Sequence, residues 1–214
     1  MLLIDSASAG DVESAYDEGL VTGVTMNPSL VAAQAPTAPL DVLRNVLKVS
    51  VGPVFYQPTS AEDPAAEVSA ALDIGGDRLV VKLAATAEHT RLARHLTDRG
   101  VPVAITAVYA PAQALVACSL GAGWVIPYVD RARRLMPEAP GVVAALASVL
   151  RGRPGAPRIL AASVKSPRQA VDAVRDGADA LTIPLAVLRS LVAHPHTQAA
   201  VREFDAATAQ ARLP

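Results

Sequence analysis

Hydrophobic residues recur along the chain in short runs rich in Val, Ile and Leu, separated by longer segments of mixed polarity. Within each run the apolar character is nearly continuous, which is typical of parallel strands covered by helices on one face and packed into a barrel on the other. We predict eight such strands, at residues 2–5, 23–26, 53–57, 79–83, 102–108, 124–129, 158–163 and 180–184.

The segments between the runs place small or branched apolar residues at helical spacing. They predict helices at residues 11–20, 40–50, 64–74, 87–99, 112–120, 142–150, 167–175 and 185–192. Several end before a glycine, such as Gly75 or Gly121, where a positive φ closes a helix. Eightfold strand-helix alternation predicts a (β/α)8 TIM barrel. A doubly wound open sheet gives a similar pattern, but the number of units and the chain length favour the barrel.

The chain has 214 residues, 51% of them hydrophobic, which suffices for one sizeable core. We therefore expect residues 1–214 to form a single barrel domain. A further helical stretch, at about residues 198–211, follows the eighth unit and is not needed to close the barrel. We expect it to cover another surface, such as that of a neighbouring subunit.

Composition narrows the function classes. Nineteen basic and twenty acidic side chains leave a net charge of -1, so we expect neither nucleic acid nor an anionic membrane as partner. The only cysteine, Cys118, has no Cys/His cluster around it, so no metal is expected. The N-terminus lacks a basic start before a long apolar stretch, and no run approaches membrane-spanning length. We expect a cytoplasmic protein that binds a small molecule.

In a parallel barrel the active site forms at the C-terminal ends of the strands. The polar residues that end or follow the predicted strands are Asp5, Thr25, Asn27, Gln57, Lys82, Thr106, Tyr128, Ser163 and Lys165. Lys82 is the sharpest candidate, because LVVKLAA surrounds an ammonium with apolar neighbours, and a buried lysine is costly unless paired or neutral. Burial lowers a lysine pKa from about 10.4 and supplies the free amine that Schiff-base chemistry requires. A lysine that reaches solvent from an edge strand explains this local pattern equally well.

The other strand-end residues also have two interpretations each. Asp5 fits a general acid or base, but its position before a helix is equally typical of an N-cap. Gln57, Thr106 and Tyr128 end three strands and offer groups that hold a water near Lys82, or they are separately satisfied polar groups. Asn27 opens the sequence NPS, which resembles an Asx-type turn at the start of a helix.

A basic group follows the sixth and seventh strands. Arg131, Ser163 and Lys165 are placed to bind a phosphate at the barrel mouth, and Arg133 and Arg134 make this part of the chain locally basic. A solvated run of surface charge is the alternative explanation.

Several motifs in a fixed order resemble the small class I transaldolase family, and within it the fructose-6-phosphate aldolase-like branch. They are GVTMNPSL, LVVKLAAT, AITAVYAPAQALVA, IPYVDR, LAASVKSPRQA and LTIPLAVL, and the resemblance spans essentially the whole chain. It implies a cofactor-independent Schiff-base enzyme of carbohydrate metabolism, such as the pentose phosphate reactions, acting on a sugar or sugar phosphate. It also implies a homo-oligomer, a ring-like pentamer or decamer, in which the terminal helix packs on a neighbour.

The resemblance also implies roles for individual residues. Lys82 is the amine that attacks the substrate ketone, and Asp5 assists proton transfer. Gln57, Thr106 and Tyr128 match the positions that hold the catalytic water in the aldolase branch, whereas the transaldolase branch typically has Glu and Phe at the first and third. This difference favours an aldolase with a dihydroxyacetone-type donor over a transaldolase.

The remaining matched positions are assigned to substrate. Thr25 and Asn27 match substrate-binding positions, and Arg131, Ser163 and Lys165 match positions associated with the sugar phosphate. Three features depart from the family pattern: Met26 replaces a threonine, Ala84 replaces a proline, and the loop after Arg131 lacks the usual acidic and glycine-rich continuation. These departures also leave open a non-catalytic barrel that binds a phosphosugar.

Overall fold

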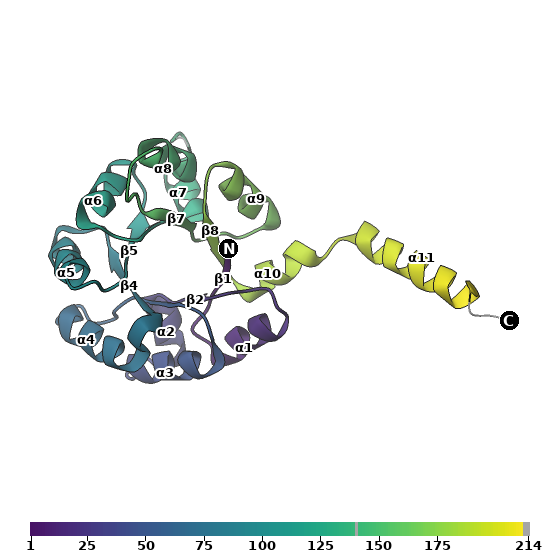
Figure 1. Ribbon diagram of the computed structural model, residues 1–214, viewed down its shortest axis with the longest axis horizontal. Coiled ribbons are helices and arrows are strands. Elements are labelled where there is room, and N and C mark those ends of the chain that lie inside the picture. Colours follow the sequence, from purple (N-terminus) through teal and green to yellow (C-terminus); the bar gives the residue numbers. More distant parts are fainter. Residues whose placement is uncertain (140, 212–214) are drawn as a thin grey trace.

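Eight parallel strands close into a barrel in sequence order (Figure 1). The computed structural model describes residues 1–139 and 141–211. Strand β1 pairs with β2 on one side and with β8 on the other, so the sheet has no edge. This closure confirms the predicted (β/α)8 barrel and excludes the open sheet. The strands are β1 (Leu2–Asp5), β2 (Val24–Thr25), β3 (Val54–Tyr56), β4 (Leu79–Ala84), β5 (Val103–Val108), β6 (Trp124–Pro127), β7 (Arg158–Ala161) and β8 (Ala180–Ile183).

Helices surround the barrel as an outer ring (Figure 1). They are α1 (Ala9–Asp17), α2 (Pro28–Gln34), α3 (Pro39–Val49), α4 (Pro64–Gly75), the 3₁₀ turn η1 (Gly76–Arg78), α5 (Ala87–Asp98), α6 (Ala112–Leu120), α7 (Val129–Leu135), α8 (Val142–Leu150), α9 (Pro167–Arg175), α10 (Leu185–Val192) and α11 (Pro195–Ala211).

The core has two layers, because successive strand residues point to opposite faces of the sheet. A large cluster between sheet and helices contains Ile4, Val81 and Ile105. A smaller cluster fills the barrel itself and consists of Leu3, Phe55, Val80, Ala104, Ile126, Leu160, Ala162 and Ala180, with Trp124 and Tyr128 packed against it. The apolar runs are therefore continuous because both faces of each strand are buried.

Some predicted boundaries were wrong. Helices α2 and α7 are missing from the predicted helical ranges, although the Asx-type turn at Asn27 indicated a helix start, and Val129 begins α7 instead of ending a strand. The segment after Arg131, interpreted as a loop, is helical as far as Leu135. Helix α4 is closed by Gly76, whose φ is 52°, and not by Gly75, which keeps a right-handed φ of -92°. The 3₁₀ turn that follows α4 accounts for this shift of one residue.

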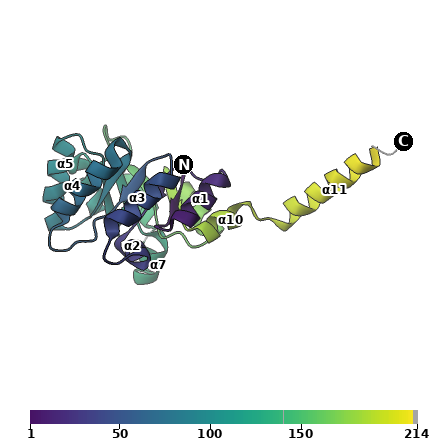
Figure 2. The same ribbon diagram turned by 90° about the horizontal axis from the view of Figure 1, so that it is seen from below.

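The last helix, α11, projects away from the barrel in both views (Figures 1 and 2). It spans Pro195–Ala211, beginning three residues before the expected start, and leaves Val201 50% and Phe204 68% exposed. None of the helices in the described part of the chain is both long enough and apolar enough to cross a membrane.

Candidate active site

A ring of polar side chains lies directly above the apolar filling of the barrel. Residues two positions further along a strand point to the same face, so each interior apolar residue fixes the direction of the next. Going two residues from the interior cluster toward the C-terminal strand ends gives Asp5, Gln57, Lys82, Thr106, Tyr128 and Thr182. Five of these six residues were predicted from the sequence. The structure therefore brings them to one end of the barrel, where barrel active sites form.

Lys82 lies in the middle of β4 and is only 3% exposed. Its ammonium donates a hydrogen bond of 2.7 Å to the backbone carbonyl of Met26. Burial lowers the pKa of Lys82 to about 8, and the nearby negative charge of Asp5 opposes that shift. The side chain does not reach solvent from an edge strand, because the barrel has no edge. A substantial fraction of the amine is thus neutral near physiological pH.

Asp5, at the end of β1, is held by a chain of hydroxyl groups. The Thr25 hydroxyl donates to Asp5 Oδ1 at 3.0 Å and lies 2.6 Å from the Thr182 hydroxyl. Burial raises the pKa of Asp5, while Lys82, Thr25 and Lys165 each lower it. The N-cap of α1 is Ser8 and not Asp5, so the capping interpretation of Asp5 is excluded. The Asp5 carboxyl group is therefore held by Thr25 and does not contact the start of α1 as a cap.

Two other members of the polar ring each carry a buried oxygen atom that, within the described residues, has no hydrogen-bond partner. These atoms are Gln57 Oε1 and Thr106 Oγ1. Such atoms are rare in folded proteins and usually bind water or a ligand. Burial raises the pKa of the third residue, Tyr128, an effect that the nearby Thr106 hydroxyl only partly opposes. Tyr128 thus remains a neutral hydroxyl that can donate and accept hydrogen bonds.

The polar residues that follow β6 and β7 are more exposed than Lys82 and Thr106. Arg131, in the first turn of α7, places its guanidinium 5.0 Å from the ring centre of Tyr128. Ser163, just past β7, has a positive φ of 59° and accepts a 3.1 Å hydrogen bond from the Asp130 backbone at its carbonyl. Lys165 is exposed, and its positive charge contributes to lowering the pKa of Asp5.

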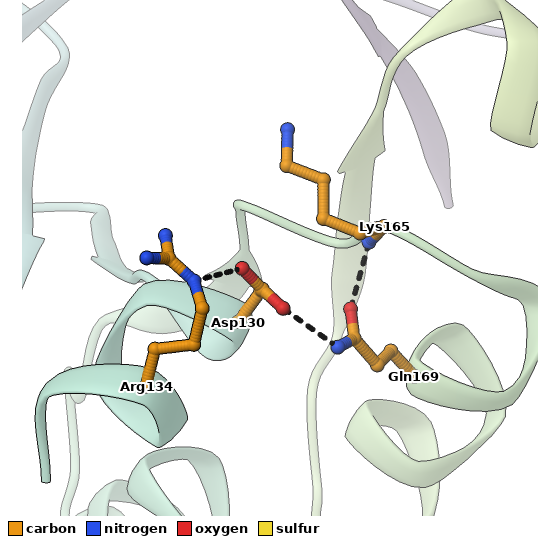
Figure 3. A network of polar contacts seen from close by, with 4 residues as sticks. All are labelled: Asp130, Arg134, Lys165 and Gln169. Carbon is orange, nitrogen blue, oxygen red and sulfur yellow. Dashed lines mark hydrogen bonds and ion pairs between the residues drawn. The ribbon is translucent and has the colours of Figure 1, made fainter.

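Gln169 and Asp130 join the first turn of α7, which carries Arg131, to the β7–α9 connection, which carries Ser163 and Lys165 (Figure 3). The Gln169 amide donates to Asp130 Oδ1 at 3.0 Å and accepts from the backbone N–H of Lys165 at 2.8 Å. Arg134 binds the second oxygen of Asp130 from the solvent side at 2.9 Å. The Lys165 ammonium extends away from this network (Figure 3). Side-chain hydrogen bonds of Gln169 thus hold the first turn of α7 and the β7–α9 connection together.

The departures from the family pattern have structural consequences of different size. The Met26 side chain is fully buried among helix-facing residues, and only its backbone carbonyl contacts Lys82. Any residue supplies that carbonyl, so the substitution leaves the lysine contact unchanged. Ala84 extends β4 by pairing with Thr106. The Asn27 side chain caps α2 by accepting the Leu30 N–H at 3.1 Å, as the turn interpretation predicted.

Sequence reasoning missed Thr182, Asp130 and Gln169. Thr182 is 1% exposed in an otherwise apolar strand, which was the same signal that identified Lys82. Asp130 and Gln169 lie on amphipathic helices among other polar residues, and nothing in the sequence distinguishes them from solvated surface groups.

The fold and the ring of polar side chains at the C-terminal strand ends are typical of a barrel enzyme. Among residues 1–139 and 141–211, no group of three or more His, Cys, Asp or Glu side chains is arranged to hold a metal ion. The chain belongs to the transaldolase/fructose-6-phosphate aldolase family, whose model matches residues 2–213. It is accordingly an enzyme of the transaldolase and aldolase class.

Individual relatives agree with this family. The chain is 34% identical over 207 residues to a probable transaldolase of Anaeromyxobacter dehalogenans, covering 94% of this chain and 93% of the relative. It is 31% identical over 206 residues to a probable transaldolase of Thermoplasma volcanium, with 95% and 92% covered. Inosine 5'-monophosphate dehydrogenase from Legionella pneumophila matches in structure with a TM-score of 0.62 at 17% identity. That match covers 87% of this chain and 58% of the dehydrogenase chain, and at this identity it concerns the barrel fold alone.

Proposed function

We propose that the protein is a class I aldolase that forms a Schiff base between Lys82 and a ketose or a dihydroxyacetone-type donor. The observation that carries the proposal is the buried Lys82 amine, with its pKa lowered to about 8 and the Asp5 carboxyl group nearby. A lysine desolvated in this way is a nucleophile at neutral pH. An imine polarises the adjacent carbon-carbon bond without a metal ion.

The proposed reaction begins with attack of Lys82 Nζ on the donor carbonyl carbon and loss of water. The resulting iminium accepts the electron pair of the carbon-carbon bond that breaks, leaving an enamine on Lys82 and releasing an aldehyde. Asp5 takes the proton of the hydroxyl group that becomes the aldehyde. Protonation of the enamine carbon and hydrolysis then return the free lysine. A water held by Gln57, Thr106 and Tyr128 serves these proton transfers, which the two unpaired buried oxygens support.

The groups around the lysine receive separate roles in the proposal. Thr25, whose hydroxyl contacts both Asp5 and Thr182, orients the carboxyl group at the edge of the substrate site. Asn27 contributes to binding the donor hydroxyls. Arg131, Ser163 and Lys165 bind the phosphate of a sugar phosphate, supported by their common position on the basic side of the mouth.

A transaldolase is the second candidate, and the names of the relatives favour it. In that reaction the enamine attacks an acceptor aldehyde instead of being protonated. Gln57 and Tyr128 support the aldolase, because the resemblance associates Glu and Phe with the transaldolase branch.

Product analysis separates the two reactions. Purified protein is incubated with fructose 6-phosphate alone and with added erythrose 4-phosphate. The proposal predicts release of dihydroxyacetone and glyceraldehyde 3-phosphate without the acceptor. Turnover that requires erythrose 4-phosphate would assign the protein as a transaldolase instead.

We further propose a cytoplasmic homo-oligomer of single-domain subunits, ring-like and pentameric or decameric, in which α11 covers a neighbouring copy. The exposed Val201 and Phe204 on a helix that projects from the barrel support this arrangement. Light scattering of the full chain and of a chain ending at Ala193 tests it. The full chain is expected to be oligomeric and the shortened chain monomeric, and a monomeric full chain would contradict the proposal.

A further inference from the structure

One carboxylate holds the connection between β3 and α4. Glu67, in the first turn of α4, accepts hydrogen bonds from the backbone N–H groups of Thr59 at 2.9 Å and Ser60 at 2.7 Å. It also accepts bonds from the Thr59 hydroxyl at 3.1 Å and from the Tyr56 hydroxyl. These donors lie on both sides of Gln57 in the chain. Glu67 therefore ties the last residue of β3 to the loop beyond it.

The geometry keeps Glu67 itself out of the barrel mouth. Its partner Tyr56 is fully buried and belongs to the cluster between sheet and helices, not to the barrel interior. Burial raises the pKa of Tyr56 and the Glu67 carboxylate adds to that rise, so the phenol remains a proton donor. The first turn of a helix also favours a negative charge. Glu67 thus binds the end of β3 and the loop after it from the helix-facing side of the sheet.

Gln57 lies between the clamped residues and faces the opposite way. It follows Tyr56 directly and lies two residues after Phe55, which fills the barrel interior. Its Oε1 atom is buried and, among the described residues, unpaired, so no hydrogen bond to this oxygen fixes the amide. Pro58, which is buried, restricts the backbone after it. The position from which the Gln57 side chain extends therefore depends on the backbone that Glu67 holds on both sides of it.

We propose that Glu67 is a positioning residue that sets the orientation of the Gln57 amide at the barrel mouth without touching the substrate. This inference rests on the proposed function, because the amide orientation matters for imine chemistry at Lys82. A group displaced by a fraction of an ångström supports proton transfer less well, so the effect falls on the chemical step and leaves donor binding unchanged.

A double-mutant cycle of E67Q and Q57L tests the proposal. The readouts are kcat and KM with fructose 6-phosphate, and the rate at which borohydride traps dihydroxyacetone on Lys82. E67Q keeps the side-chain shape but replaces one acceptor oxygen with a donor. We expect kcat and the trapping rate to fall about tenfold, with KM within about twofold. In the Q57L background, E67Q is expected to change either rate by less than about twofold.

The matched control is E62Q, the same chemical change at an exposed glutamate of the same connection. It is expected to leave both rates unchanged. Circular dichroism and thermal unfolding establish that each variant is folded. If E67Q does not fold, Y56F, which removes one hydroxyl donor to Glu67, takes its place in the cycle with an expected loss of about threefold.

The outcomes distinguish the positioning role of Glu67 from the Schiff-base mechanism at Lys82. Loss of rate that disappears in the Q57L background supports a positioning role. Equal losses in both backgrounds, or a loss in KM alone, overturn it and leave Glu67 a purely structural residue, while the Lys82 mechanism stands. A wild-type protein that forms no adduct at Lys82 overturns the proposed function and this inference together.

Discussion

The barrel interior has a lower layer, the apolar cluster that contains Leu3, Phe55 and Leu160, and an upper layer, the polar ring at the C-terminal strand ends. The two layers are formed by the same strands at positions two residues apart, and they differ in polarity and charge. The lower layer is apolar and close-packed, with Leu3, Phe55 and Leu160 at 0–1% exposure. The upper layer holds Gln57, two threonines and three ionisable side chains, Asp5, Lys82 and Tyr128, whose pKa values are shifted by burial. Burying the charged groups of the upper layer costs free energy of folding. The packing of the apolar lower layer offsets that cost. Substitutions in the two layers are therefore expected to affect stability and activity in opposite ways.

Removing the buried amine gives the largest expected effect on activity. Lys82→Met is expected to lower turnover by at least about 10⁴-fold, because the covalent step is lost. The same change is expected to increase stability. The pKa of Lys82 falls from 10.5 unfolded to about 8 folded, so the folded state gains stability as the pH rises through this window. Chemical denaturation at pH 7 is expected to show Lys82→Met more stable than the wild type by about 3 kcal/mol.

The pH dependence of that difference provides the control. As the pH rises from 8 to 10.5, the stability of the wild type is expected to approach that of Lys82→Met. The variant lacks the titration of Lys82 and is therefore not expected to gain stability from it in this window. A variant less stable than the wild type at pH 7 would place Lys82 among the stabilising residues and contradict the division between layers.

Substitution of the carboxyl group tests the second ionisable member of the upper layer. Asp5→Asn is expected to lower turnover about 100-fold through loss of proton transfer. Because the negative charge of Asp5 raises the pKa of Lys82, its removal is also expected to move the midpoint of the pH profile for borohydride trapping to lower pH. Asp17→Asn, at an exposed carboxylate at the end of α1, is the control. An unchanged midpoint would show that Asp5 does not act on the lysine.

The exposed side of the mouth is expected to give a smaller and more selective effect. Gln169→Leu removes the link between Asp130 and the Lys165 backbone (Figure 3). Since the loss concerns about two hydrogen bonds near the surface, kcat/KM for fructose 6-phosphate is expected to fall about tenfold. Trapping of unphosphorylated dihydroxyacetone should change by less than about twofold.

Arg134→Ala is the matched control for this change, because Arg134 binds Asp130 from the solvent side with a side chain that is 64% exposed. Arg134→Ala is expected to leave both kcat/KM for fructose 6-phosphate and the trapping of dihydroxyacetone unchanged. An equal loss of both activities in Gln169→Leu would mean that the network stabilises the whole mouth and does not act on phosphate binding.

A substitution in the lower layer is expected to change activity least and stability most. Leu160→Ala removes a fully buried side chain beneath the mouth and is expected to cost about 2–5 kcal/mol, measured by denaturant unfolding. Trapping at Lys82 per folded molecule should remain within about twofold of the wild type. The exposed Leu135, changed to Ala, serves as the stability control. Loss of trapping in a folded Leu160→Ala protein would show that the two layers are not separable.

The fold could be predicted from the sequence because the apolar layer and the polar ring each produce a recognisable pattern of residues in the strands. Burial on both faces produces continuous apolar runs, and the strand period of two makes a polar residue in such a run point into the barrel. Lys82, Thr106 and Asp5 were found in this way. Thr182 carries the same signal and was overlooked, because threonine is an ordinary strand residue.

Other parts of the site could not be read from local patterns. Glu67 and Gln169 act through hydrogen bonds to backbone groups that become neighbours only when the barrel closes. Helix α7 begins directly after β6, where the sequence continues an apolar run into Val129. The shift of the helix end from Gly75 to Gly76 depends on the 3₁₀ turn that precedes β4. In each case the outcome depends on tertiary contacts that the local sequence does not reveal.

Identification of the lysine that forms the Schiff base tests the central claim most directly. The chain has three lysines, of which Lys48 and Lys165 are exposed and Lys82 is buried. Dihydroxyacetone and borohydride are added together, and the adduct is located by peptide mass spectrometry. The account predicts stoichiometric modification of Lys82 and none of the two exposed lysines at low donor concentration. Modification of Lys48 or Lys165 with Lys82 unmodified would contradict it.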